Sequence, residues 1–77
     1  MPRDWLERRV CDGIAGLYGI APDQVTLAAR LTDLGTDSLR FAELVLWLHD
    51  RFGIAEPDGL ESVETVGDLV GLIRRYL

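Results

Sequence analysis

The residues best suited to chemistry lie in the segment LTDLGTDSLRF, which spans residues 31–41. Ser38 follows turn-forming residues and precedes a strongly apolar segment, so it stands at the start of a predicted helix. A serine there either caps the helix or presents its hydroxyl for modification. If Asp37 is the cap instead, Ser38 becomes the first helical residue and its hydroxyl can point outwards. The N–H groups and dipole at a helix N-terminus then favour a phosphodiester on Ser38.

Other catalytic chemistry has little support in this sequence. The G-x-S-x-G elbow of serine hydrolases is absent, and His49 lies eleven residues after Ser38 on the same predicted helix, too far away to activate it. The single cysteine, Cys11, cannot form an internal disulfide, and its place beside Val10 in a predicted helix indicates a small buried side chain. One histidine and one cysteine offer no zinc cluster. We therefore expect no catalytic residue and no metal site.

The length and charge of the chain favour a binding or carrier domain. The 77 residues predict one domain, residues 1–77, whose core is too small to accompany a large catalytic cleft. The net charge of −5 argues against a nucleic-acid partner and suits docking onto basic patches of other proteins. Because neither a run of 18 apolar residues nor a signal peptide is present, we expect a cytoplasmic monomer without membrane contact.

Hydrophobic periodicity predicts an all-α fold. Apolar residues at helical spacing indicate three longer helices, over residues 4–18, 38–52 and 66–76. Pairs at capping-box spacing precede three predicted helices: Asp4/Glu7, Asp58/Glu61 and Thr65/Asp68. The second pair introduces a short helix that ends near Val63, and residues 19–37 form a long packed loop with one helical turn near residues 22–25. The predicted architecture is a four-helix bundle with a short third helix and a long loop between helices 1 and 2.

The predicted helix over residues 38–52 has two apolar faces on a helical wheel. One face collects the expected core residues, Phe41, Leu44, Val45, Leu48 and Phe52. Leu39 and Leu46 lie on another face, next to the carboxylates Glu43 and Asp50. Single exposed leucines are common on protein surfaces, but a pair flanked by acidic residues indicates a docking strip for a basic partner.

Trp47 lies between Arg40 and Arg51 on the same wheel. The ring either covers these neighbours through cation–π contact or contacts a partner protein. The sequence favours neither interpretation over the other.

The segments DLGTDSL, ELVLWLHDRFGI and VETVGDLVGLI together resemble the acyl carrier protein family, and the similarity covers roughly residues 6–73. The resemblance implies that Ser38 receives a 4′-phosphopantetheine arm from coenzyme A. It further implies a separate phosphopantetheinyl transferase that reads Asp37 and Leu39. The thiol of the arm would hold acyl groups as thioesters, so the protein itself would be a carrier without enzymatic activity.

The resemblance also implies a partner-binding face. Glu43 matches an acidic position in the middle of the recognition helix, and Leu46 matches an apolar partner contact. Glu61 and Glu64 lie on or near the short third helix, which helps family members to recognise partners. The full predicted face comprises Leu39, Arg40, Glu43, Leu46, Trp47, Asp50, Glu61 and Glu64. The implied partners are the transferase and acyl-loading or acyl-processing enzymes, such as a ketosynthase, an acyltransferase or a ligase.

Four residues depart from the pattern of fatty-acid carriers. Arg40 and His49 stand where acidic residues are usual, and Phe41 and Trp47 are bulkier than the typical small residues. These departures favour a dedicated carrier in polyketide or other specialised biosynthesis over a fatty-acid role. The two aromatic side chains would also shrink the space that shelters a long acyl chain between the helices.

Two alternatives to an acyl carrier stay open. One is a peptidyl or aminoacyl carrier, whose motif commonly has a second glycine where Thr36 stands and whose acidic face is commonly weaker. The other is an acidic helical interaction module that carries no cargo, in which Ser38 serves only as a helix cap.

Overall fold

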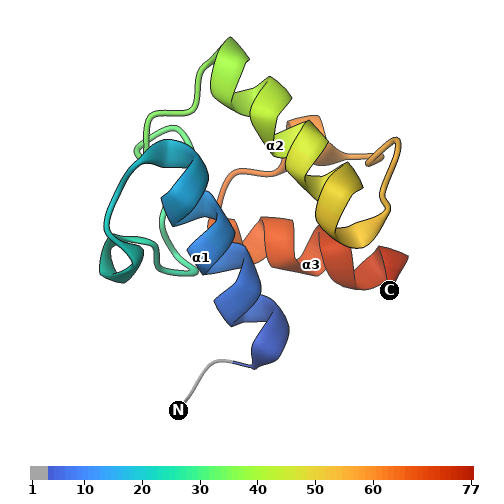
Figure 1. Ribbon diagram of the computed structural model, residues 1–77, viewed down its shortest axis with the longest axis horizontal. Coiled ribbons are helices and arrows are strands. Elements are labelled where there is room, and N and C mark those ends of the chain that lie inside the picture. The colour runs from blue at the N-terminus through green and yellow to red at the C-terminus, as the bar shows by residue number, and fades with distance from the viewer. Residues whose placement is uncertain (1–3) are drawn as a thin grey trace.

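The computed structural model describes residues 4–77, which form three α-helices joined by one long and one shorter connection (Figure 1). The helices are α1 at Trp5–Tyr18, α2 at Ser38–Phe52 and α3 at Val66–Tyr76. Two single 3-10 turns lie in the connections, η1 at Pro22–Gln24 and η2 at Leu60–Ser62. Residues 4–77 contain no strand. The predicted all-α class, the three longer helices and the turn near residues 22–25 are confirmed.

The predicted fourth helix is not confirmed. In its place is η2, a single 3-10 turn that begins after Gly59 and has no side-chain cap. The expected cap, Asp58, instead donates its backbone N–H to the hydroxyl of Tyr76 at 2.7 Å. Because Gly59 adopts the left-handed conformation, with φ of 87°, the capping geometry cannot form there. A three-residue turn without a cap forms too few hydrogen bonds to extend into a helix.

The other two predicted cap pairs lie at helix starts. The carboxylate of Asp4 accepts a hydrogen bond from the backbone N–H of Glu7 at 2.8 Å. Asp4 also forms an ion pair with Arg74, which ties the start of α1 to the last turn of α3. The Glu7 N–H and the Arg74 guanidinium together hold the pKa of Asp4 below its ordinary value. At the start of α3, Thr65 and Asp68 form the reciprocal capping box that their spacing predicts.

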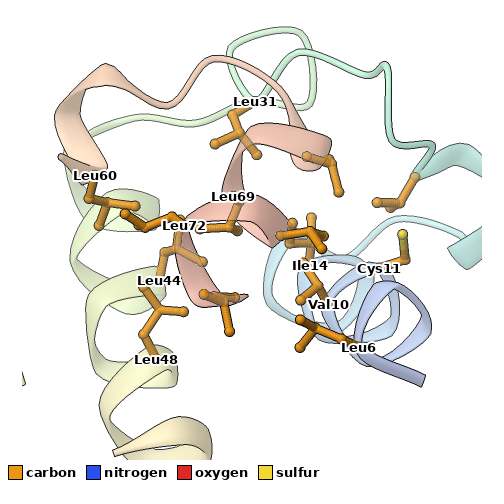
Figure 2. Close-up of a cluster of buried hydrophobic side chains, with 14 of the residues drawn as sticks. Leu6, Val10, Cys11, Ile14, Leu31, Leu44, Leu48, Leu60, Leu69 and Leu72 are labelled. Atoms are coloured by element: carbon orange, nitrogen blue, oxygen red, sulfur yellow. The ribbon is translucent and has the colours of Figure 1, made fainter. Parts of the chain in front are cut away.

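The core lies where α1 faces α2 and α3 (Figure 2). All three helices contribute buried side chains: Leu6, Val10, Cys11 and Ile14 from α1, Leu44 and Leu48 from α2, and Leu69 and Leu72 from α3. Leu31 and Leu60 enter the same cluster from the two connections. The burial of Cys11 is as predicted. No helix within residues 4–77 has the length and apolar character needed to cross a membrane.

The predicted core face of α2 is correct for its middle and wrong for its first turn. Leu44 and Leu48 are fully buried, and Val45 and Phe52 are half-buried. Phe41, in contrast, is 38% exposed. The green end of α2 projects beyond the other two helices, so most of its first turn lies outside the core (Figure 1).

The loop between α1 and α2 is packed, as predicted, and it pairs with the start of α3. The N–H of Leu31 donates to the carbonyl of Glu64 at 2.9 Å, and that of Gly67 donates to the carbonyl of Leu27 at 2.8 Å. A Cβ atom at Gly67 would lie 3.0 Å from the same Leu27 oxygen, so glycine permits this close approach. The loop therefore reaches Ser38 from a fixed position beside α3.

Candidate functional site

Ser38 is the first residue of α2, and the residue before it is the cap. The carboxylate of Asp37 accepts a hydrogen bond from the N–H of Arg40 at 2.8 Å. Of the two readings of Ser38, the one in which Asp37 caps the helix is therefore correct. Ser38 is exposed, and its hydroxyl has no hydrogen-bond partner among residues 4–77. A side chain that the helix does not need for its own stability is available for modification.

The backbone of the first turn of α2 is also incompletely paired. The cap satisfies Arg40, whereas the N–H groups of Ser38 and Leu39 have no partner within residues 4–77. Unpaired N–H groups at the positive end of a helix dipole favour a phosphate oxygen nearby. The chain contains one other serine, Ser62, which ends the short turn η2 and has no such helix start beside it.

The turn that leads into Ser38 is closed around the carbonyl of Leu31. This oxygen accepts the N–H groups of Leu34 and Thr36, at 3.1 and 3.2 Å, and the hydroxyl of Thr36 at 2.7 Å. Gly35, with φ of 99°, supplies the left-handed backbone that the turn requires. The conformation before Ser38 is thus set by local hydrogen bonds.

The side chain of Arg40 packs against the last turn of α1 and is only partly exposed to solvent. Its Nη1 donates to the carbonyl of Leu17 at 2.6 Å, and its guanidinium lies 5.9 Å from the ring centroid of Tyr18. The same nitrogen is 3.5 Å from a carboxylate oxygen of Glu43. The predicted partner-binding face includes Arg40, but these contacts were not predicted, because Leu17 is 23 residues away in the sequence.

The predicted docking strip lies on an exposed side of α2. Leu39 and Leu46 are 65% and 62% exposed, Asp50 is exposed and Glu43 is half-buried. Their spacing along α2 places the four residues on one side of the helix. Such large apolar side chains, left in water between carboxylates, are available to a partner protein.

Trp47 packs against α1. Its ring lies over the bare backbone of Gly13, where a Cβ atom would come within 2.2 Å of it. The ring also meets Phe52 edge to face, with 5.4 Å between ring centroids. The cation–π contact found within residues 4–77 joins Arg40 to Tyr18, so the structure does not support the first of the two interpretations of Trp47, a cation–π contact with Arg40 and Arg51. The half-buried ring acts first as a spacer between α1 and α2, and its contact with a partner stays a prediction.

Beside the start of α2 lies an open hollow of about 430 Å³. Phe41 and Leu44 line it from α2, and Thr36 lines it two residues before Ser38. Glu61 and Glu64, both exposed, line the same hollow from the connection between α2 and α3. The structure therefore brings the two predicted glutamates to the same hollow as the start of α2, although they lie more than twenty residues further along the chain.

These features define a small helical domain with an available hydroxyl at the start of its second helix. A sequence model described as the phosphopantetheine attachment site matches residues 8–73. The match covers most of the chain, and the chain belongs to this family. It is accordingly a carrier protein that bears a covalent 4′-phosphopantetheine group and has no catalytic activity of its own. As a carrier it works with a phosphopantetheinyl transferase and with biosynthetic enzymes.

The start of α2 fits such a group. A phosphodiester needs an accessible hydroxyl, and Ser38 presents one at a helix start with two unpaired N–H groups. The hollow beside it offers apolar surface from Phe41 and Leu44 together with polar groups at its rim. No three acidic, histidine or cysteine side chains within residues 4–77 gather as a metal site.

Proposed function

We propose that this protein carries acyl intermediates as thioesters on a 4′-phosphopantetheine arm attached to Ser38. The observation that supports this assignment is the unused hydroxyl of Ser38 beside the unpaired N–H groups of Ser38 and Leu39. Ser62, the other serine, has no comparable setting.

Attachment would form a bond from the Oγ of Ser38 to phosphorus and release the nucleotide part of coenzyme A, with the hydroxyl proton passing to a base on the transferase. The protein contributes exposure of Oγ, while the cap by Asp37 keeps the first turn of α2 intact. The dipole of α2 offsets the charge of the phosphodiester. When attached, the arm supplies the thiol that forms the thioester.

We assign recognition by partner enzymes to the exposed side of α2 together with the acidic rim of the hollow. Leu39, Glu43, Leu46 and Asp50 supply apolar anchors between carboxylates, which suits a basic partner surface. Glu61 and Glu64 add two carboxylates to the hollow, which Arg30 also lines. Leu39 and Asp37 flank Ser38 and are the residues that we expect the transferase to contact.

We further propose that the cargo belongs to polyketide or other specialised biosynthesis rather than to long-chain fatty-acid synthesis. Leu44 and Leu48 fill the interior beneath α2, and the exposed ring of Phe41 occupies part of the hollow. This leaves an open and partly polar surface in place of a deep apolar channel. If solution NMR of a long-acyl form showed large shifts at Val45 and Leu48, the chain would be entering the core and this proposal would be wrong.

A peptidyl carrier receives less support from the structure. The position where that motif commonly has a second glycine is occupied by Thr36, whose hydroxyl donates to Leu31 and also meets the Tyr18 hydroxyl. A glycine could form neither hydrogen bond. The turn before Ser38 is thus built around a side chain.

The test is incubation of the protein with coenzyme A and a broad-specificity phosphopantetheinyl transferase, followed by mass spectrometry. We expect the added mass of one arm on the wild-type protein and on Ser62→Ala. The Ser38→Ala variant should gain no mass. If Ser38→Ala is still modified, or if the wild-type protein gains no arm while a control carrier does, the assignment of Ser38 is wrong.

A further inference from the structure

The last turn of α1 is linked to the chain on both sides of Ser38. Thr36, two residues before Ser38, has its Oγ1 2.6 Å from the hydroxyl of Tyr18. Arg40, two residues after Ser38, donates to the carbonyl of Leu17 at 2.6 Å. Two consecutive residues of α1 therefore hold the two sides of the candidate attachment site.

The direction of the Tyr18 bond follows from the number of available protons. The hydroxyl of Thr36 has one hydrogen, which it donates to the carbonyl of Leu31 at 2.7 Å. The oxygen of Thr36 can therefore only accept a hydrogen bond from Tyr18, so the Tyr18 hydroxyl is the donor. Tyr18, Thr36 and Leu31 form a continuous chain of hydrogen bonds from α1 into the turn before Ser38.

The Arg40 bond satisfies a group that α1 cannot satisfy itself. The carbonyl of Leu17 belongs to the last four of the helix, which lack a partner N–H within it. Arg40 is held in place from two further sides, by the ring of Tyr18 and by the carboxylate of Glu43. With only 37% of its side chain exposed, Arg40 is poorly placed to act as a free charge on the docking face.

We propose that Tyr18, Thr36 and Arg40 are positioning residues that hold Ser38 in the conformation that the phosphopantetheinyl transferase binds. We name these three residues the brace. The proposal rests on the assignment of Ser38 as the attachment site. The first turn of α2 projects beyond the other helices, so little core packing restrains it (Figure 1). Without the brace, a smaller fraction of molecules would present Ser38 correctly, and the apparent affinity for the transferase would fall by that fraction.

The test uses variants of similar size that each remove one polar group of the brace. Tyr18→Phe and Thr36→Val remove the two hydroxyls, and Arg40→Met removes the guanidinium but keeps the apolar stem. Tyr76→Phe is the matched control for tyrosine, because the Tyr76 hydroxyl bonds to Asp58 in the other connection. Arg51→Met is the matched control for arginine, at the exposed opposite end of α2.

Two readouts are needed for each variant: transferase kinetics with the carrier as varied substrate, and amide hydrogen exchange. We expect each brace variant to raise the KM for the carrier about threefold to tenfold, with a smaller change in kcat. Exchange should quicken at Thr36 and Arg40, whose N–H groups are hydrogen-bonded to Leu31 and Asp37, relative to the core amides of α1. The double variant of Tyr18→Phe with Thr36→Val should resemble Thr36→Val alone, because that substitution already removes the bond to Tyr18 together with the bond to Leu31. The two control variants should leave KM and the exchange of residues 36–40 unchanged.

Tyr18 makes this test decisive because it is only 6% exposed and cannot contact the transferase directly. If Arg40→Met raises KM but Tyr18→Phe does not, Arg40 is a direct contact and the brace is wrong. If KM stays unchanged in all three variants, the brace is also wrong. In both cases the arm would still be attached to Ser38, so the outcome is distinct from a failure of the proposed function.

Discussion

Helices α2 and α3 begin in opposite ways. At α3 every N–H of the first turn is paired: Val66 donates to Ala29, Gly67 to Leu27 and Asp68 to Thr65. The carboxylate of Asp68 in turn accepts the N–H groups of Glu64 and Thr65. At α2 a single cap from Asp37 satisfies Arg40 and leaves two N–H groups exposed.

The difference separates a helix start that stabilises the fold from one that is available to a ligand. The paired start of α3 lies against the long loop, where unpaired groups would be costly. The open start of α2 projects into solvent, where water can pair the same groups until a phosphate replaces it. Because α1 also begins with a single aspartate cap, from Asp4 to Glu7, the open start of α2 gains its meaning from the unused hydroxyl of Ser38 beside it. The comparison therefore supports the assignment of the arm to α2 and can be tested by altering each start.

Removal of the cap residue at each helix start should give the largest contrast. Asp37→Ala and Thr65→Ala each delete one cap hydrogen bond, so each should lower the free energy of unfolding by about 1 kcal/mol. Attachment of the arm should slow about tenfold or more in Asp37→Ala, because the turn that holds Ser38 loosens. It should keep the wild-type rate in Thr65→Ala. Denaturant unfolding and transferase kinetics on the same samples measure both effects.

Asp37→Asn separates the two roles of Asp37, which are to cap α2 and to contact the transferase. Asparagine caps helices about as well as aspartate, so stability should be close to that of the wild type. If the transferase reads the carboxylate, attachment in Asp37→Asn will still slow; if the cap alone matters, it will recover. Equal loss of attachment in Asp37→Ala and Thr65→Ala would remove the contrast between the two helix starts.

Most of the fold followed from local signals in the sequence. The bounds of the three α-helices were predictable because apolar periodicity and cap residues act within one turn. The Asp58/Glu61 pair wrongly predicted a capped helix. Gly59 takes the left-handed conformation there, and the Asp58 N–H donates to the hydroxyl of Tyr76. Gly59 lies within the four residues of the pair and permits the left-handed turn, whereas the contact with Tyr76 is 18 residues away and is not encoded in them.

The site was predictable where it depends on one helix and not where it depends on two. The helical wheel correctly predicted that Leu39 and Leu46 are exposed, because the direction of each side chain follows from its position along α2. It could not show that the first turn projects beyond its neighbours, which exposes Phe41. It also could not show that Arg40 reaches back to α1, or that Gly13 makes room for Trp47. These contacts join residues far apart in sequence, and a single sequence carries no signal for them.

A second, smaller contrast lies between the exposed side of α2 and the surface of α3. Leu46→Ala removes an exposed anchor, so stability should change by less than about 0.5 kcal/mol. Turnover by an acyl-processing partner should fall about threefold to tenfold through a higher KM for the carrier. Arg75→Ala, a substitution of an exposed residue on α3, serves as the control and should change neither quantity. If both substitutions weaken the partner reaction equally, the docking face is not confined to α2.

The smallest expected effect concerns acid, and it belongs to the paired start of α3. The backbone N–H of Thr65, followed by that of Glu64, lowers the pKa of Asp68 below its ordinary value of 3.8. A carboxylate whose pKa is lower in the folded protein stabilises the fold above the unfolded value, and this contribution is lost as the pH falls through the folded value. Stability should therefore decline below about pH 4, with Asp4 contributing in the same direction.

Asp68→Asn tests this dependence at the start of α3. The variant should be slightly less stable than the wild type at pH 7, because the amide oxygen is a weaker acceptor than the carboxylate. The difference should shrink as the pH falls below 4, since the wild-type carboxylate is then protonated too. Thermal unfolding from pH 7 to pH 2.5 measures both curves. A gap that stays constant over this range would mean that the charge of Asp68 does not stabilise α3, and the paired helix start would then owe its stability to the loop carbonyls and the Thr65 hydroxyl.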